Sequence, residues 1–360
     1  MADVLGNSVH AMSVTFAMIG MGTALRAAGV VSPAGQRDMS QVAVKLLLPA
    51  FNFSALVSEV TWARLQSCSG VALFAVIHMV LGLALGSMLC CLCRSSAFMQ
   101  RHRGQVLVLC AFCNGTAMPL TLFRALESAP QLKDRLGSAA EGALDITIYG
   151  TVWRLLLWTV GIALLEADAA QEKAKVEPPT GEEPRANGAE PRKSSFRRLV
   201  RAALLNTNTI GSVAGLAIAL GPPGLRWLVF EGPLTFLREA CANVAKASHA
   251  MLLLTLGAAL WPIPASSDWR AVSGVCVAKL VVMPFATLAL LRASTGLGLG
   301  AVGSLVVAIE GCVPSALQVS MMVQTVGQDS RTCTVICFWQ HVVALLTMTT
   351  FVAVALASLF

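Results

Sequence analysis

The chain has 360 residues, of which 56% are hydrophobic and 12% are charged, and its formal net charge is +7. A soluble domain carries roughly 25% charged residues, so this composition, with a mean hydropathy of +0.71, excludes a soluble globular protein. The hydrophobic residues form runs of about 20, the length of a membrane-spanning helix. This excludes a transmembrane barrel, whose strands alternate over about ten residues.

Ten hydrophobic segments follow one another along the chain, each long enough for one spanning helix. They lie at about 9–30, 40–58, 69–92, 105–124, 143–165, 201–221, 234–260, 271–292, 299–324 and 334–358. No basic region precedes the first segment, which is expected to remain as a span rather than to be cleaved as a signal peptide. The sequence therefore predicts an all-α membrane protein with ten transmembrane helices.

A polar stretch at 166–198 divides these segments into two groups of five. It is rich in Glu, Lys, Pro and Gly, cannot bury a core, and is predicted to be a flexible linker. Residues 1–165 would form the first five-helix repeat and residues 199–360 the second. Because each half has an odd number of spans, the second enters the membrane from the opposite side, which is an inverted repeat.

The fourth and ninth segments are interrupted at matching positions. CNGTAMP (113–119) breaks the fourth and EGCVPSA (310–316) breaks the ninth. A bilayer core holds no water, so backbone groups freed by such a break must be satisfied inside the protein or beside a wet cavity. Paired breaks of this kind are typical of the binding site of a transporter built from repeats.

The residues at these breaks are the first candidates for a binding site. Asn114 is expected to turn its amide toward a cavity, and a half-helix starting there would direct free N–H groups at a carboxylate. The alternative is that Asn114 only satisfies backbone groups freed by the proline. The neighbours expected to share the substrate site are Gly115, Pro119, Pro314 and Ser315.

Charged residues inside the spans are the second set of candidates, because a charge at mid-membrane usually faces a cavity or a partner. The basic ones are Lys45, Arg154, Lys246 and Lys279. Glu310, close to the second break, is predicted to act in coupling or gating by binding a proton or a cation. The alternative is a fixed ion pair between Glu310 and one of the lysines.

In the seventh segment Asn243, Lys246 and His249 recur every three residues and so share one helical face. Lys246 would give an anion its counter-charge, and His249 would titrate during gating. The alternative is an interfacial stretch whose long side chains extend toward water. The same two interpretations apply to Lys45: it would either give a substrate its counter-charge or extend toward water.

Other patterns concern orientation, packing and chemistry. Lys and Arg are concentrated in loops on the linker side, which places the linker in the cytosol.

The spacings Gly82–Gly86 and Gly211–Gly215 predict close helix contacts. No HExxH, GxSxG or P-loop motif is present, so we predict no enzymatic activity, metal site, cofactor or nucleic-acid partner.

Four strings give the chain a family resemblance. KLLLPAFNFSAL (45–56), FCNGTAMPL (112–120), LLNTNTIGSVAGLAIAL (204–220) and CFWQHVVALLTMT (337–349) resemble the auxin efflux carrier family, and the short linker resembles its PIN-LIKES branch. The resemblance implies two inverted five-helix repeats whose helices 4 and 9 cross at Pro119 and Pro314. It also implies that a substrate carboxylate binds near that crossing, where Asn114 matches the family's asparagine.

The same resemblance implies a scaffold of helices 1, 2, 6 and 7, a homodimer, and a place in the endoplasmic reticulum or the plasma membrane. Two residues depart from the family pattern. Thr207 replaces a usual proline, and Glu310 beside the second crossing would oppose an anion unless it is protonated or paired.

The combined prediction is a secondary transporter in the lipid bilayer that moves a small organic anion by alternating access at the crossing. Indole-3-acetic acid or a related carboxylate is the leading substrate. One alternative is a sodium-coupled symporter of the organic-anion or bile-acid type. Another is a membrane receptor or scaffold that does not transport.

Overall fold

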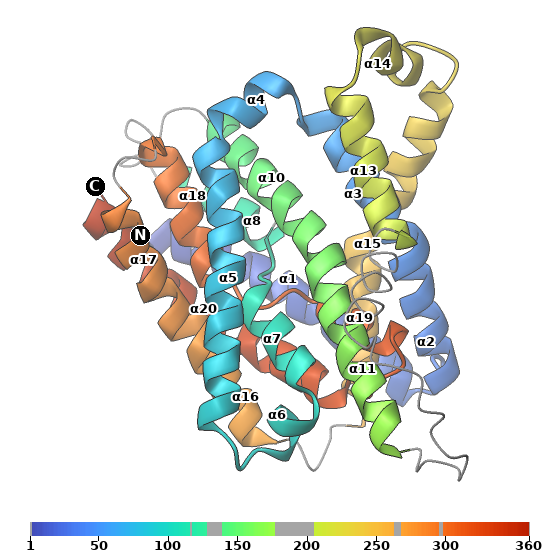
Figure 1. Cartoon of the computed structure of the whole chain (residues 1–360), viewed down its shortest axis with the longest axis vertical. Helices are drawn as coiled ribbons and strands as arrows, with labels where there is room; N and C mark the ends of the chain where they lie inside the picture. The colour runs from blue at the N-terminus through green and yellow to red at the C-terminus, as the bar shows by residue number, and fades with distance from the viewer. Residues whose placement is uncertain are drawn as a thin grey trace, which may run out of the picture.

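The computed structural model describes residues 2–115, 117–127, 139–176, 205–262, 268–294 and 298–359 (Figure 1). Within these ranges the regular elements are helices, and the single β contact is an isolated bridge between Cys113 and Ser315. The predicted all-α class is therefore confirmed for the described part of the chain.

The first half of the chain begins with a long helix and continues through shorter ones. Two of its helical runs contain a π-helical turn, written η, and a third is broken between α7 and α8. The elements are α1 (Ala2–Ala27), α2 (Pro33–Val42), η1 (Ala43–Leu47), α3 (Leu48–Glu59), α4 (Trp62–Ser67), α5 (Ser69–Leu92), α6 (Ala97–Arg101), α7 (Arg103–Ala111), α8 (Ala117–Glu127), α10 (Ala139–Leu156), η2 (Leu157–Gly161) and α11 (Ile162–Val176).

The second half has a similar make-up. Its elements are α13 (Thr207–Leu220), α14 (Pro223–Phe230), α15 (Thr235–Ala259), α16 (Trp269–Val277), η3 (Ala278–Val282), α17 (Met283–Ala293), α18 (Gly300–Cys312), α19 (Gln318–Thr325) and α20 (Arg331–Leu359). Each of the ten predicted hydrophobic segments thus falls on one helix or on successive helices.

Five helical runs in the described residues are long and apolar enough to cross a membrane by themselves: Pro33–Ser58, Ser69–Leu92, Glu141–Glu172, Trp269–Ala293 and Arg331–Leu359. A sixth would be the pair α13 and α14, which is bent by 113°. The fourth and ninth segments are each split into two helices that are too short to span a bilayer alone. The chain is an integral membrane protein, and ten spans in two inverted repeats remain a prediction.

The first part of the predicted linker is helical. Helix α11 runs on to Val176, so residues 166–176 are helical, and residues 177–198 lie outside the described residues. This part of α11 is rich in Ala, Glu and Lys, which favour helix. One of its faces is also buried, since Asp168 and Ala169 are both buried.

The helices pack in two groups, and the first halves of both broken segments belong to the second group. Helix α1 packs along α15, and α3 packs along α13 and α15. In the other group α5 packs along α7 and α10, while α18 packs along α17 and α20. Figure 1 shows α3 and α13 on the right and α5, α17 and α18 on the left, with α7 and α10 between them.

Both predicted glycine pairs lie at helix contacts. A Cβ atom on Gly82 or Gly86 would meet α7, at Cys110 and Leu107 respectively. A Cβ atom on Gly211 would lie 2.8 Å from the carbonyl oxygen of Pro49, at the start of α3. Close approach of backbones through small residues is a common packing mode of membrane helices.

Candidate functional site

The two broken segments lie against each other in the interior. The peptide between α7 and α8 runs antiparallel to the peptide between α18 and α19. The backbone N–H of Asn114 donates to the carbonyl of Pro314 at 2.7 Å, and the N–H of Ala316 donates to the carbonyl of Phe112 at 3.0 Å. Four of the backbone groups at the breaks are thus satisfied by the opposite segment, as a water-free interior requires.

Ser315 anchors this contact to two further helices. Its hydroxyl donates to the carbonyl of Leu109 on α7. Its backbone N–H donates to Oε1 of Gln340 on α20 at 2.7 Å. Gln340 is fully buried and was not among the predicted site residues, although a polar side chain in the middle of a hydrophobic segment was a usable signal.

Replacing Gln340 with leucine is expected to destabilise the chain by about 1–3 kcal/mol, because it leaves a buried N–H without an acceptor. The measurement is thermal unfolding of the purified protein in detergent. Gln318→Leu is the matched control, because Oε1 of Gln318 accepts no hydrogen bond from any residue that the structure describes. An equal loss of stability in both variants would contradict the anchoring role of Gln340.

A cavity of about 250 Å³ lies beside this crossing, between α3, α10, α15 and the start of α19. Its volume is just below the range of about 300–1,000 Å³ that is common for ligand pockets, which suits a small ligand. Most of its wall is apolar. The described residues that line it are Leu48, Phe51, Asn114, Gly115, Trp153, Arg154, Ser248, His249, Leu252, Ala316, Leu317 and Gln318.

Arg154 gives this cavity a positive charge. Its side chain is only 2% exposed, and the guanidinium carbon lies 5.4 Å from the centre of the Phe51 ring. A guanidinium group presents a planar fork of donors that matches a carboxylate. Among the described lining residues Arg154 is the permanent cation, and Asn114 adds an amide close by.

Some of the predicted site residues line this cavity. Asn114, Gly115 and His249 line it. Pro119, Pro314 and Ser315 are buried within the crossing but are not among the described lining residues, which are given above.

Both predicted counter-charges lie elsewhere. Lys45 is exposed on η1, and Lys246 is exposed on α15, where its ammonium group donates to Oδ1 of Asn243 at 2.9 Å. Neither is among the described residues that line the cavity. The cation that does line it, Arg154, was recognised in the sequence as a charge within a span but was not chosen as a site residue.

Glu310 lies directly behind the crossing. It is fully buried, and its Oε2 accepts a hydrogen bond from the thiol of Cys113 at 3.6 Å. Its Oε1 has no hydrogen-bond partner among the described residues. Two cations, Lys279 on η3 and Arg154 on α10, lie close enough to interact electrostatically with this carboxylate.

A chain of buried polar side chains continues from Cys113 toward α17. The thiol lies 3.8 Å from the hydroxyl of Tyr149, which lies 2.8 Å from Nδ1 of His78. Nε2 of His78 in turn lies 3.1 Å from the hydroxyl of Thr287. His78, Tyr149 and Thr287 come from three different helices, and the sequence alone gave no indication that they meet.

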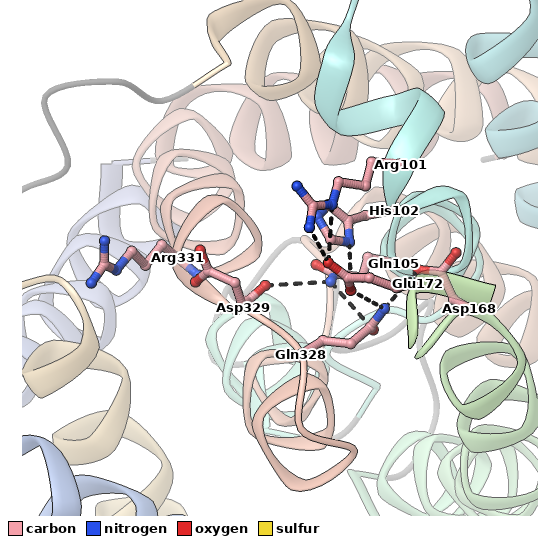
Figure 2. A network of polar contacts seen from close by, with 8 residues as sticks. All are labelled: Arg101, His102, Gln105, Asp168, Glu172, Gln328, Asp329 and Arg331. Atoms are coloured by element: carbon pink, nitrogen blue, oxygen red, sulfur yellow. Dashed lines mark hydrogen bonds and ion pairs between the residues drawn. The ribbon is translucent and has the colours of Figure 1, made fainter. Parts of the chain in front are cut away.

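A polar network fixes the outer ends of the broken helices (Figure 2). Arg101, just before α7, forms an ion pair with Glu172 of α11 at 2.7 Å. The amide of Gln328, in the loop after α19, donates to Asp168 at 3.1 Å and to Glu172 at 3.4 Å. Gln105 of α7 reaches Gln328 at 3.4 Å. The start of α7, the end of α11 and the end of α19 are thereby held together.

A second cavity, of about 660 Å³, lies between α1, α16 and α20. The described residues that line it are apolar or aromatic except for Thr23, and none of them is ionisable. It therefore offers an anion no counter-charge. The described part of the chain also holds no group of three or more His, Cys, Asp or Glu side chains placed to bind a metal.

Comparison with known proteins identifies related sequences. A family model described as membrane transport protein matches residues 8–352. Protein PIN-LIKES 2 of Arabidopsis thaliana is 29% identical over 160 residues, a stretch that takes in 42% of this chain and 35% of the relative. The match thus spans about a third of the length of that curated relative.

Proposed function

Since this chain belongs to the membrane transport protein family, the family of the auxin efflux carriers, we propose that it carries a small organic anion across the membrane. In this proposal the anion's carboxylate binds beside the crossing. Membership of this family makes the chain a transporter rather than an enzyme. The observation that carries the proposal is the buried guanidinium of Arg154 in the wall of a cavity that Asn114 also lines.

The polar and apolar walls of the cavity would bind different parts of the ligand. Arg154 supplies the counter-charge that the sequence had assigned to Lys45 or Lys246, and Asn114 donates a further hydrogen bond to the carboxylate. Phe51, Trp153 and the neighbouring leucines would contact the apolar part of the ligand. An indole or phenyl carboxylate such as indole-3-acetic acid meets both requirements.

Transport would follow from movement of one helix group against the other. The cavity lies between α3 and α15 on one side and α10 and the crossing on the other. Rocking of these groups would open the cavity to alternate faces of the membrane, as in carriers built from inverted repeats. The proposal includes ten spans, a cytosolic linker, a homodimer and residence in the endoplasmic reticulum or plasma membrane.

The test is uptake of labelled indole-3-acetic acid into proteoliposomes, beside benzoate and a bile acid, with and without pH and sodium gradients. The wild-type protein is expected to show saturable uptake. Asn114→Ala should raise the KM by roughly 10-fold or more, because a hydrogen bond to a charged group contributes about 1.5–3 kcal/mol. Gln66→Ala, which removes an exposed amide from α4, is the control and should leave uptake unchanged.

The same experiment separates the alternatives. Unchanged uptake in Asn114→Ala would remove Asn114 from the site. Uptake that requires a sodium gradient would indicate a sodium-coupled symporter. Binding of the anion without uptake, in protein shown to be folded, would indicate a receptor.

A further inference from the structure

The second cavity, between α1, α16 and α20, has an interior that suits hydrocarbon. Its volume of about 660 Å³ lies within the range of about 300–1,000 Å³ that is common for ligand pockets. Apart from two indole N–H groups, the polar side chain among its described lining residues is Thr23. The hydroxyl of Thr23 donates to the carbonyl of Gly257 at 2.9 Å, so its proton is already used. The cavity therefore offers little to a polar ligand and a large contact area to an apolar one.

Four of the lining side chains form a connected row of aromatic rings. The ring centres of Phe16 and Phe338 are 6.1 Å apart, those of Phe338 and Trp339 are 5.7 Å apart, and those of Trp339 and Trp269 are 5.8 Å apart. Each pair packs edge to face, the arrangement that aromatic rings prefer. The row joins α1, α20 and α16, so this apolar wall is already formed without a ligand.

The cavity is a recess in the surface that faces the lipid. Trp269 on α16 is 56% exposed and Trp339 on α20 is 37% exposed, and both belong to helical runs that are long and apolar enough to cross a membrane. On α1 the lining residues Gly20 and Ala24 are exposed, and so is their large apolar neighbour Met21. The lipid-facing surface is thus continuous with the walls of the cavity, and a lipid chain can enter it sideways.

One end of the cavity lies where its helices end. Trp269 is the first residue of α16, Ala27 is the last residue of α1, and Leu260 directly follows α15. Tryptophan is enriched at the membrane–water interface, because its ring is apolar and its N–H is polar. The next residue, Arg270, is exposed and adds a positive charge at this end. A fitting occupant is therefore apolar along most of its length, with a polar and negatively charged group at one end.

We propose that this cavity binds one acyl chain of a membrane phospholipid, whose glycerol and phosphate groups lie at the end marked by Trp269 and Arg270. The lipid would sit between α1, which packs along α15, and α16 and α20, which pack together. This site shares no described lining residue with the cavity beside the crossing, so the inference does not rest on the proposed function.

The test is quenching of tryptophan fluorescence by a phosphatidylcholine with brominated acyl chains, because bromine quenches an indole that it contacts. Purified, delipidated full-length protein in detergent is titrated with this lipid, and with the unbrominated lipid as a blank. The wild-type protein should show quenching that saturates as the mole fraction of lipid in the micelles rises. Replacing both Trp269 and Trp339 with phenylalanine keeps the aromatic row and should remove most of the saturable part.

A second pair of variants fills the cavity or leaves it open. Gly20→Phe places a ring in the recess, since among the described residues nothing beyond the helix's own nearby backbone lies within 4 Å of a Cβ atom there. It should raise the half-saturating mole fraction about tenfold or more, because losing the burial of two methylene groups is sufficient for that. Val14→Phe is the matched control on α1, at an exposed position outside the described lining, and should keep the wild-type curve.

Thermal unfolding shows which variants fold, and Ala24→Phe replaces Gly20→Phe if the latter does not. If neither filled variant folds, the variant without the two tryptophans carries the test. Quenching that rises without saturation overturns the inference, because it indicates general contact with lipid. Equal half-saturation in the filled variant and in Val14→Phe overturns it too, as does saturable quenching that persists without the two tryptophans. Loss of a dimer in Gly20→Phe, with no saturable quenching in the wild type, would assign the recess to a second copy of the chain instead. All these outcomes leave the proposed anion site standing.

Discussion

Replacing Arg154 with glutamine is expected to weaken binding of a monovalent carboxylate by roughly 100-fold or more. Removing one partner of a desolvated, hydrogen-bonded charge pair costs about 2–5 kcal/mol, and each 1.4 kcal/mol is about tenfold in affinity. The guanidinium is 2% exposed, so water cannot replace the lost interaction with the ligand.

The measurement is the dissociation constant for benzoate, with thermal unfolding as the check on folding. Arg154→Lys keeps the charge but loses the planar fork, so it should fall between the wild type and the glutamine variant. Arg226→Gln is the matched control. Arg226 stacks on Phe230 in α14, 5.2 Å from the ring centre, and neither residue is among the described lining of the cavity. Binding by Arg154→Gln at the wild-type affinity would place the ligand elsewhere.

The positions of the helices could largely be predicted from the sequence, because the bilayer dictates the length and polarity of each segment. The breaks at 113–119 and 310–316 could be predicted for the same reason, since Gly and Pro residues there interrupt hydrophobic runs. Glu310 was recognised as a charge beside a break, and it lies there in the structure.

Which charged side chain faces the interior could not be predicted in the same way. Lys45 and Lys279 both lie in π-helical turns, η1 and η3, yet Lys45 is exposed and Lys279 is 1% exposed. A π turn shifts the helical register, so residue spacing along the segment no longer tells which face a side chain takes. Arg154 lines the described cavity and Lys45 and Lys246 do not, a difference that depends on how the helices pack against one another.

Contacts between distant segments could not be predicted from the sequence either. The anchoring of Ser315 by Gln340 and the chain from Cys113 to Thr287 depend on how four or more helices approach one another. The end of α11 depends on a polar network with the loop after α19, which keeps a charged stretch helical where composition alone indicates a linker.

Gly82→Ala is expected to destabilise the protein by roughly 2–6 kcal/mol and to abolish anion binding. A Cβ atom at this position would lie 2.5 Å from the carbonyl oxygen of Cys110 and closer still to the Cα of Ala111, so the backbone of α7 has to move. Overpacking of this kind costs about 1–3 kcal/mol. Ala111 immediately precedes Phe112, whose carbonyl accepts the N–H of Ala316, so the shift also strains the bridge across the crossing at a further cost of about 1–3 kcal/mol.

Gly20→Ala provides the matched control, because it makes the same change within a helix where, among the described residues, nothing beyond the helix's own nearby backbone lies within 4 Å of the new Cβ. There the methyl group should stabilise α1 by about 0.5–1 kcal/mol through reduced backbone entropy. Thermal unfolding and benzoate titration of both variants are the measurements. A Gly82→Ala variant that unfolds at a higher temperature than the wild type would mean that α5 and α7 separate easily. In that case the half-helix before the break is not held in place by this contact, and the geometry of the crossing would depend on Ser315 and Gln340 instead.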